Sequence, residues 1–358
     1  MDKNMRLRAQ PIRMRKTRVV VVGLGPIGIE LGRLVSAQSE TFQLVAAVDR
    51  APHLAGRPLR DLFGTRAPRG RVSAEPPSPR GGEGLAFLTT TSSIRSVAPT
   101  LERLLELGYH VVSSTEELSY PPLREPRVAA RIDRAAQKAK RCVVATGINP
   151  GFAMDVWPLI LASNAQTLER VQVVRVVDAS DRREPLQRKV GAGMSQREFE
   201  ALAREGRIGH VGLAESCAHL GSALGWPLDV LRESLRPCIA EKRIRTAYFD
   251  VAPGQVSGIQ HSVVGMQGKK RRVALDLRME LDAVNPRDEV KLEGKPPIHC
   301  NVPGGFQGDR TTSAQLVSAA ARIGSMPPGL HLASELPTPR RPAPRLRLTL
   351  AGTSKRGT

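Results

Sequence analysis

The segment RVVVVGLGPIGIELGRL, at residues 18–34, constrains the fold of this chain more than any other. A run of β-branched residues leads into a glycine-rich turn, after which apolar residues recur at helical spacing. A second β-like segment, from Gln43 to Val48, ends at Asp49. A strand, a GxGxxG turn, a helix and a second strand that ends in an acid are typical of a doubly wound parallel sheet. The segment therefore predicts a Rossmann nucleotide-binding domain.

The same segment predicts how a dinucleotide would bind. Glycines let backbone N–H groups approach a pyrophosphate at a helix N-terminus, and the acid can accept hydrogen bonds from the adenosine ribose. Arg50 could instead pair with a 2′-phosphate, so NAD and NADP are both candidates. A purely structural glycine turn is the alternative interpretation. The candidate cofactor-binding residues of this segment are Gly23, Gly25, Pro26, Ile27, Gly28, Asp49 and Arg50.

The pattern along the rest of the chain predicts two kinds of domain. Up to residue 148, helical patterns alternate with strands such as YHVVSS and CVVAT, which favours an α/β domain with a parallel sheet. From Leu168 onward, longer alternating stretches such as RVQVVRVVD and RRVALDLRMELDA predict an α+β domain with a largely antiparallel sheet. We expect a basic tail (1–17), an NAD(P)-binding domain (18–148), a substrate and dimerisation domain (149–309), a segment returning to the first domain (310–340) and a second basic tail (341–358).

Residues 51–84 interrupt the predicted first domain. They are rich in proline, glycine and arginine, as in APRGRVSAEPPSPRGGEG. Such a composition is typical of an exposed connection between elements. We expect an exposed, partly mobile loop here, and assign no chemistry to it.

Charge and composition exclude several classes of function. The net charge is +20, but residues 1–18 hold seven basic residues against one acid, and residues 339–358 hold six against none. The middle of the chain therefore has only a modest surplus, and with 3% aromatic residues it is poorly suited to nucleic-acid binding. The four cysteines form no CxxC pair, so no metal site is expected. Unpaired cysteines and the lack of a long apolar run indicate a cytoplasmic protein without a membrane span.

Three loops are expected at the carboxyl ends of the parallel strands, where ligands bind in such sheets. STEELSYP holds Glu116 and Glu117, and one of these carboxylates is a candidate acid or base, although a solvated acidic pair is the commoner outcome. In TTTSS and ATGINPGFAMD we expect cofactor contacts, with Phe152 forming an apolar wall. A simple helix-entry turn is the alternative for the latter. The candidate cofactor contacts of these loops are Thr90, Thr91, Ser92, Asn149, Pro150 and Gly151.

Seven motifs in order, VVGLGPIG, VVSSTEELSYP, ATGINPGFAMD, VVDASDRREPLQRKVGAGM, IGHVGLAES, NPRDEV and VPGGFQGD, resemble the 2,4-diaminopentanoate dehydrogenase and native amine dehydrogenase family. Members share the dihydrodipicolinate reductase-like architecture. The resemblance runs from about Arg18 to Arg340 and leaves both tails outside it. It implies NAD(P)-dependent oxidative deamination of a small amine or diamine similar to 2,4-diaminopentanoate, and the reverse reductive amination of a carbonyl with ammonia. It also implies a homodimer.

The resemblance assigns roles to individual residues. The family's catalytic glutamate corresponds to the STEELSYP loop, where we favour Glu116 and keep Glu117 as the alternative. For the substrate pocket it implies Phe152, Arg175 and His210. The alternative interpretations are a solvated arginine for Arg175 and a structural histidine for His210. Residues 178–194 resemble a loop that covers the site.

Two other functions fit the same pattern. One is a dihydrodipicolinate reductase-like imine reductase, which would share the architecture but fits the STEELSYP segment less well. The other is a non-enzymatic Rossmann sensor or binding protein, whose basic tails would form the interaction surface.

Overall fold

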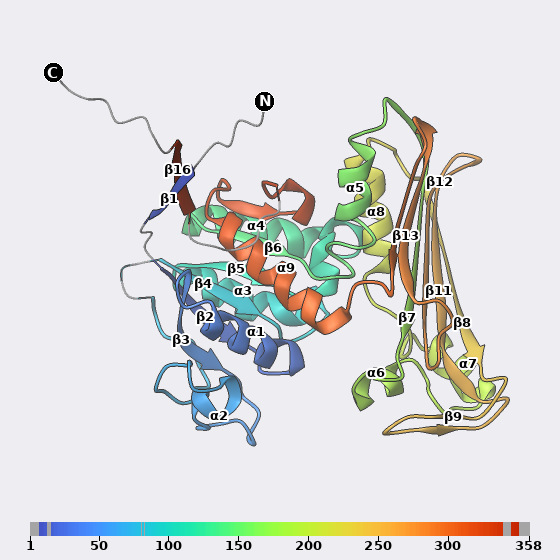
Figure 1. The fold of residues 1–358 in the computed structure, drawn as a ribbon, viewed down its shortest axis with the longest axis horizontal. Coiled ribbons are helices and arrows are strands. Elements are labelled where there is room, and N and C mark those ends of the chain that lie inside the picture. The colour runs from blue at the N-terminus through green and yellow to red at the C-terminus, as the bar shows by residue number, and fades with distance from the viewer. Residues whose placement is uncertain (1–6, 13–15, 80, 82, 339–344, 351–358) are drawn as a thin grey trace.

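Two six-stranded sheets form the body of the protein (Figure 1). The computed structural model describes residues 7–12, 16–79, 81, 83–338 and 345–350. The remaining parts of the two predicted basic tails lie outside the described residues. Within the described part of the chain, none of the helices has the length and apolar character needed to cross a membrane.

The first sheet is parallel throughout, in the order β15-β6-β5-β4-β2-β3. The chain moves from β2 to β3 on one side and then to β4 on the other, so the carboxyl ends of β2 and β4 form a switch point where ligands bind. The strands are β2 (Thr17–Val22), β3 (Phe42–Val48), β4 (Gly84–Leu88), β5 (Tyr109–Ser113), β6 (Cys142–Ala145) and β15 (Gly329–His331).

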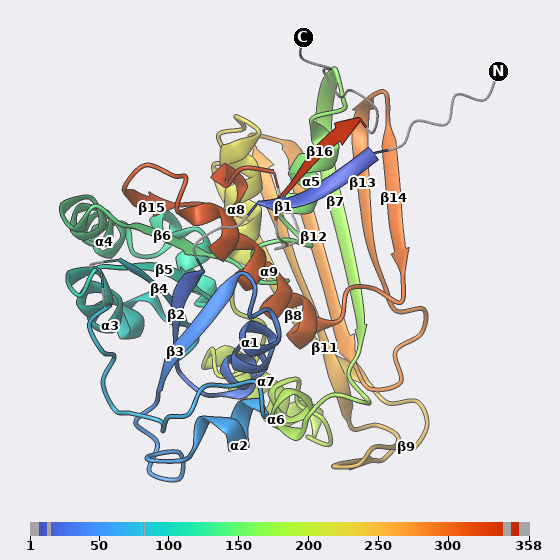
Figure 2. The same ribbon diagram turned by 60° about the vertical axis from the view of Figure 1, so that its left-hand side comes forward.

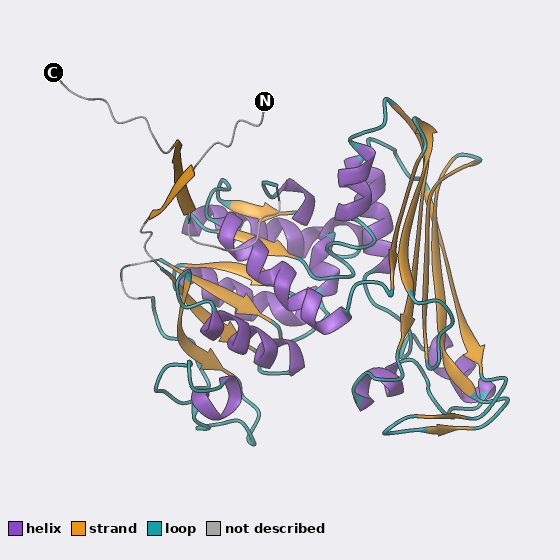
Figure 3. Ribbon diagram, viewed as in Figure 1, coloured by secondary structure: helices purple, strands orange, loops and turns teal. Residues whose placement is uncertain are grey.

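Helices cover both faces of this sheet (Figure 3). The valines of β2 alternate between two apolar cores, Val19 and Val21 in one and Val20 and Val22 in the other. Such a strand is buried on both sides, which is why its sequence is a continuous apolar run. Leu316 and other residues of α9 join the first core, so the chain returns to this sheet after the second one. The helices are α1 (Pro26–Ala37) and α9 (Gly308–Ile323) on one face and α3 (Ile94–Glu106) and α4 (Pro126–Ala139) on the other.

Residues 51–79 are mostly exposed, as expected, but buried apolar side chains hold them against the first domain. They form α2 (Leu59–Phe63), and Leu59 and Phe63 are only 1% and 4% exposed. A Cβ on Gly32 of α1 would lie 2.4 Å from the Phe63 ring, so a glycine is needed there for the close approach. Burial of one such side chain contributes about 1.5–3 kcal/mol. Scattered apolar residues therefore hold the segment in place, although proline, glycine and arginine dominate its composition.

The second sheet has the order β14-β13-β7-β12-β11-β8, and all its neighbours are antiparallel except β7 and β12. Helices α5 (Val156–Ala162) and α8 (Leu213–Ala223) pack on the face toward the first domain, and the opposite face carries no described helix (Figure 1). The predicted Rossmann and α+β fold class is thus confirmed. The strands are β7 (Thr167–Asp178), β8 (Val230–Ile239), β11 (Val256–Gln267), β12 (Lys270–Glu280), β13 (Arg287–Lys295) and β14 (Ile298–Pro303).

Smaller elements complete the fold (Figure 2). Helices α6 (Glu184–Lys189) and α7 (Gln196–Arg204) and the short strands β9 (Ile244–Arg245) and β10 (Asp250–Val251) lie at one end of the second sheet. Segments of the two predicted tails pair as antiparallel strands, β1 (Leu7–Ile12) and β16 (Arg345–Leu350). Short 3-10 turns are η1 (Glu116–Ser119), η2 (Pro121–Leu123) and η3 (Ala333–Glu335).

Candidate active site

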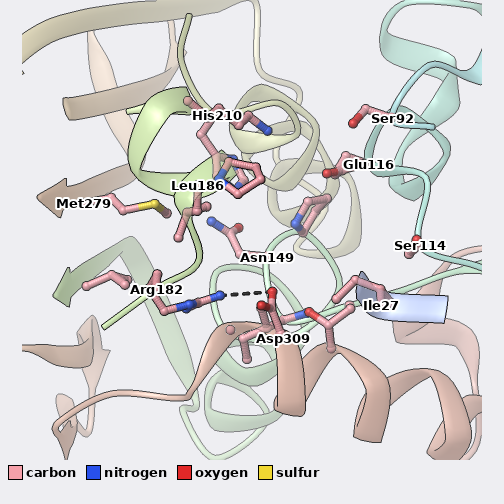
Figure 4. A pocket seen from close by; sticks show the side chains of 18 of the residues that line it. Ile27, Ser92, Ser114, Glu116, Asn149, Arg182, Leu186, His210, Met279 and Asp309 are labelled. Atoms are coloured by element: carbon pink, nitrogen blue, oxygen red, sulfur yellow. Dashed lines mark hydrogen bonds and ion pairs between the residues drawn. The ribbon is translucent and has the colours of Figure 1, made fainter. Parts of the chain in front are cut away.

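A cavity of about 360 Å³ lies between the carboxyl ends of the parallel strands and the second sheet. Both domains contribute to its lining, as does the start of α9. In Figure 4, Glu116 and Ser92 enter from one side and His210 and Leu186 from the opposite side, with Asn149 between them. Of the predicted site residues, those that line the cavity are Ile27, Thr90, Thr91, Ser92, Glu116, Asn149, Pro150, Arg175 and His210.

The glycine turn after β2 leaves space for a ligand at one position only. A Cβ on Gly28 would lie 1.9 Å from the carbonyl oxygen of Gly23, whose own φ of +90° favours glycine. A Cβ on Gly25, in contrast, would meet nothing within 4 Å. Helix α1 then begins at Pro26, with no side-chain cap and no acid in its first turn. The unsatisfied N–H groups of this turn are therefore available to an anion such as a pyrophosphate.

Asp49 stands beside this turn, at the end of β3. Its Oδ2 accepts a hydrogen bond from the backbone N–H of Leu24 at 2.6 Å, and its Oδ1 accepts one from Ala51 at 2.8 Å. A carboxylate has about four acceptor positions, so it can still receive ribose hydroxyls. The next residue, Arg50, is exposed and pairs with Glu75 at 2.6 Å. Asp49 and Arg50 lie outside the cavity lining, near the turn where the adenosine half of a dinucleotide would lie.

The structure separates the two candidate glutamates. Glu116 lines the cavity, whereas Oε2 of Glu117 accepts a hydrogen bond at 2.9 Å from the backbone N–H of Ile94, in the first turn of α3. Burial raises the pKa of Glu116, while the positive charge of Lys189 and a hydrogen bond from Ser92 act in the opposite direction. The Glu116 carboxylate in the cavity is thus a stronger base than an exposed glutamate, whereas Glu117 accepts a hydrogen bond at the start of α3.

The turn after β6 presents Asn149 to the cavity. Neither amide atom of Asn149 has a hydrogen-bond partner among the described residues, although both are buried. Asp155, which is fully buried, fixes the turn by accepting hydrogen bonds from the Gly151 N–H at 2.8 Å and the Ser216 hydroxyl at 2.9 Å. A buried amide without partners is costly unless a ligand supplies them. Asn149 therefore fits a polar ligand group such as a carboxamide.

Two predicted contacts of this loop do not reach the cavity. Gly151 lies outside the lining, and a Cβ there would be 2.3 Å from the backbone nitrogen of Gly147, so the residue serves close packing of the turn. Phe152 was expected as a cavity wall, but its ring packs edge-on against Phe306, with 5.4 Å between ring centroids. Its apolar side chain instead joins the core between α5 and the second sheet.

Arg175 lines the cavity but is held by a buried ion pair. Its Nη1 donates to both carboxylate oxygens of Asp288, at 2.6 and 2.7 Å, and its Nη2 donates to the carbonyl of Phe306. The two side chains are 3% and 1% exposed. The alternative of a solvated arginine was therefore wrong. The pair also fixes the loop before α9, since Asp288 accepts a hydrogen bond from the Phe306 N–H.

His210 faces Glu116 across the cavity (Figure 4). Burial lowers its pKa to about 3, with a further contribution from the charge of Lys189. The imidazole is therefore neutral at physiological pH. Its Nδ1 is buried and has no hydrogen-bond partner among the described residues. A neutral ring with a free nitrogen can exchange a hydrogen bond with a polar substrate.

Part of the segment 178–194, predicted to cover the site, lines the cavity. Arg182 and Arg183 both pair with Asp309 in the first turn of α9, at 3.0 and 3.2 Å, which links the second domain to a helix of the first. Lys189, from the same segment, also lines the cavity. Burial acts to raise the pKa of Asp309, but the hydrogen bonds and positive charges of the two arginines together outweigh it, so the pKa is lowered and this carboxylate is a weak base.

The sequence analysis assigned no role to Arg182, Arg183, Lys189 or Asp309. Thr89, the first residue of the TTTSS segment in which cofactor contacts were expected, follows β4 directly. Its hydroxyl donates to the carbonyl of Gly23 at 2.8 Å. For Asp309, no local pattern in the sequence distinguishes an acid that pairs across domains from a solvated one.

The arrangement thus combines an anion-binding turn with a basic carboxylate, a neutral imidazole and an unpaired amide in one cavity. The model of the 2,4-diaminopentanoate dehydrogenase C-terminal domain matches residues 152–348, more than half of the chain. The chain belongs to the 2,4-diaminopentanoate dehydrogenase family. The match extends beyond Arg340, so the resemblance reaches into the C-terminal basic tail that the sequence analysis had left outside it.

Individual relatives agree with this membership. The chain is 28% identical to 2,4-diaminopentanoate dehydrogenase of Acetoanaerobium sticklandii, over 91% of this chain and 95% of the relative. It is 25% identical to an amine dehydrogenase of Streptomyces virginiae, over 89% and 95%. The solved structure of an amine dehydrogenase from Mycobacterium smegmatis superposes with a TM-score of 0.78 at 22% identity, covering 92% of this chain and 98% of that one. This member of the 2,4-diaminopentanoate dehydrogenase family therefore shares the fold of a known dehydrogenase.

Proposed function

We propose that this protein is an NAD(P)-dependent amine dehydrogenase that deaminates a small amine or diamine similar to 2,4-diaminopentanoate, and aminates the corresponding carbonyl in reverse. The observation that carries the proposal is the position of Glu116. Its carboxylate is in the same cavity as Ile27 of the glycine turn and the unpaired amide of Asn149. Family membership gives the reaction class, and this cavity supplies a base where a dinucleotide would end.

The residues present fit a nicotinamide dinucleotide. The open space at Gly25 and the uncapped start of α1 suit a pyrophosphate, and Asp49 suits the adenosine ribose. The buried amide of Asn149 offers both a donor and an acceptor to the carboxamide at the other end. When bound, the cofactor supplies a hydride acceptor or donor. The cavity is also lined by Thr90, Thr91 and Ser92, which would contact the cofactor between its pyrophosphate and its carboxamide.

Glu116 would handle the protons of the reaction. As the amine carbon loses a hydride, its C–N bond becomes an iminium, whose positive charge the carboxylate stabilises. Water then adds to the iminium carbon, and Glu116 takes a proton from that water. The carbinolamine formed in this way releases ammonia and leaves a carbonyl. The raised pKa of Glu116 makes it a better proton acceptor than an exposed carboxylate.

The opposite wall would orient the substrate. His210 is neutral and has a free ring nitrogen, and Arg175 and Lys189 line the same side. Arg175 is ion-paired with Asp288, so it would contribute to the shape and charge of the cavity rather than donate a hydrogen bond to the substrate. A cavity of about 360 Å³ accommodates a small molecule. These features support an amine of modest size.

The proposal extends to organisation and setting. We assign cofactor binding to residues 18–148, substrate binding and dimerisation to 149–309, and the returning segment to 310–340. We assign the contact of a homodimer to the face of the second sheet that carries no described helix (Figure 1). Light scattering on the purified chain tests this directly. Placement in the cytoplasm, without nucleic-acid or membrane partners, is a prediction from composition.

The test is turnover with a panel of small primary amines that includes 2,4-diaminopentanoate. Reduction of NAD and of NADP is followed by absorbance, and the reverse reaction is run with carbonyls and ammonia. Turnover of one or more amines with release of ammonia supports the proposal. Cofactor binding without turnover of any amine or carbonyl would contradict it and favour a binding protein on the same fold.

A further inference from the structure

The proline- and arginine-rich segment after β3 forms part of the adenosine end of the cofactor site. The backbone N–H of Asp49 donates to the carbonyl of Ser73 at 3.0 Å, and the N–H of Ser73 donates to the carbonyl of Ala47 at 3.1 Å. Val48 and Ser73 form a parallel bridge. The chain around Ser73 therefore runs as a short extra strand beside the end of β3, next to the acid that faces the ribose.

This placement brings a third charge to the site. Glu75 lies two residues beyond Ser73, whose hydroxyl donates to the Glu75 carbonyl at 3.0 Å. Its Oε1 accepts a hydrogen bond from Nη2 of Arg50 at 2.6 Å. Among the described residues, Glu75 is the hydrogen-bonding and ion-pair partner found for Arg50. The side chains of Arg50 and Glu75 are 76% and 65% exposed, so both can be reached by a cofactor.

NAD and NADP differ at this position by one phosphate group on the 2′-oxygen of the adenosine ribose. With Asp49 at the ribose, that phosphate would lie beside Arg50, the cation best suited to bind it. In this protein Arg50 is already paired with Glu75, and a phosphate would have to replace that partner. It would also meet a second carboxylate close to Asp49. Both effects disfavour the phosphorylated cofactor.

We propose that Glu75 sets a preference for NAD over NADP by occupying Arg50. This inference rests on the proposed function, because it assumes a nicotinamide dinucleotide bound at the glycine turn. It assigns a role to a segment for which the composition predicted none. Asp49 alone would also favour NAD, so the test has to isolate the contribution of Glu75.

The experiment is a titration of the full-length protein with NADH and with NADPH, followed by cofactor fluorescence, without any amine. Four proteins are compared: wild type, Glu75→Gln, the double variant Glu75→Gln/Arg50→Gln, and Asp61→Asn. Asp61 is an exposed acid on α2 of the same segment, so Asp61→Asn changes the net charge equally at another place.

We expect wild type and Asp61→Asn to bind NADH more tightly than NADPH. Glu75→Gln should bind NADPH about tenfold more tightly than wild type, since each exposed charge contact contributes up to about 1 kcal/mol and two are changed. Its affinity for NADH should change less than about twofold. The double variant should lose the gain, and high salt should reduce it.

Three results would overturn the inference: an unchanged NADPH affinity in Glu75→Gln, a gain that persists in the double variant, or an equal gain in Asp61→Asn. Equal binding of the two cofactors by wild type would also overturn it. These outcomes leave the proposed function intact, because NADH still binds. If neither cofactor binds, the cofactor assignment in the proposed function fails, and the inference fails with it.

Discussion

Replacing Glu116 with glutamine removes the proton acceptor from the cavity while keeping the shape and size of the side chain. The lining of the cavity holds two carboxylates, Glu116 and Asp309, among the described residues. Asp309 is paired with two arginines and its pKa is lowered, so it cannot take over as a base. General-base catalysis contributes about 10²- to 10⁴-fold to a rate. We therefore expect kcat for deamination to fall by that factor, equivalent to about 3–5 kcal/mol of transition-state stabilisation.

The neighbouring residue provides the matched control. Glu117→Gln makes the same change one position along the chain, but its carboxylate accepts a hydrogen bond from the Ile94 N–H and lies outside the cavity. This variant should retain kcat within about threefold, and because its amide oxygen can still accept the Ile94 N–H, it should lose less than about 1 kcal/mol of stability.

Both variants are assayed by the absorbance of reduced nicotinamide at saturating amine, and NADH affinity is measured in parallel. NADH should bind Glu116→Gln as it binds wild type, because the lost group acts on substrate protons. Retention of wild-type kcat by Glu116→Gln would refute the reasoning, as would a loss in Glu117→Gln equal to that in Glu116→Gln.

Three further predictions follow from the same contacts. Lys189→Met removes a charge that lowers the pKa of Glu116, so the pKa rises further; because the base must be deprotonated, the acidic limb of the kcat profile should move to higher pH, and a downward shift would contradict this. Asp288→Asn leaves the guanidinium of Arg175 buried without its charge partner, and urea denaturation should show a loss of about 3–5 kcal/mol, with less than about 1 kcal/mol as the opposing result. Asn149→Ala should weaken NADH binding about 5- to 30-fold in fluorescence titration without lowering stability, since the amide has no partner among the described residues; the reverse pattern would exclude a role in cofactor binding.

The parts of the fold that follow from local pattern could be predicted well. Gly28 is crowded by Gly23 of the same strand-turn-helix unit, so the local sequence suffices to predict the turn there, whereas Gly23 is crowded by Thr89 from the loop after β4. The alternation of apolar runs and helical patterns likewise predicts the parallel sheet, since each strand must be buried on both faces. The position of Glu116 just after a parallel strand likewise predicts that its side chain lies at a ligand-binding cavity.

The choice between Glu116 and Glu117 was left open, because adjacent side chains in an irregular loop have no periodicity that separates them. Phe152 was placed in the cavity although it packs on Phe306, more than a hundred residues away. An aromatic residue looks the same in sequence whether it faces a ligand or a core. Only the packing of two distant segments decides which of these it does.

Local sequence patterns were enough to predict the dinucleotide turn, the succession of a parallel and a largely antiparallel sheet, and the loops that bear the site, because strand, turn and helix patterns are recognisable within short windows. Which side chains in those loops meet depends on the folded chain. Asp309 pairs with Arg182, and Glu75 pairs with Arg50, through approaches that only the folded chain creates. Such pairings depend on distance and burial in three dimensions, and the sequence around a charged residue does not indicate its partner.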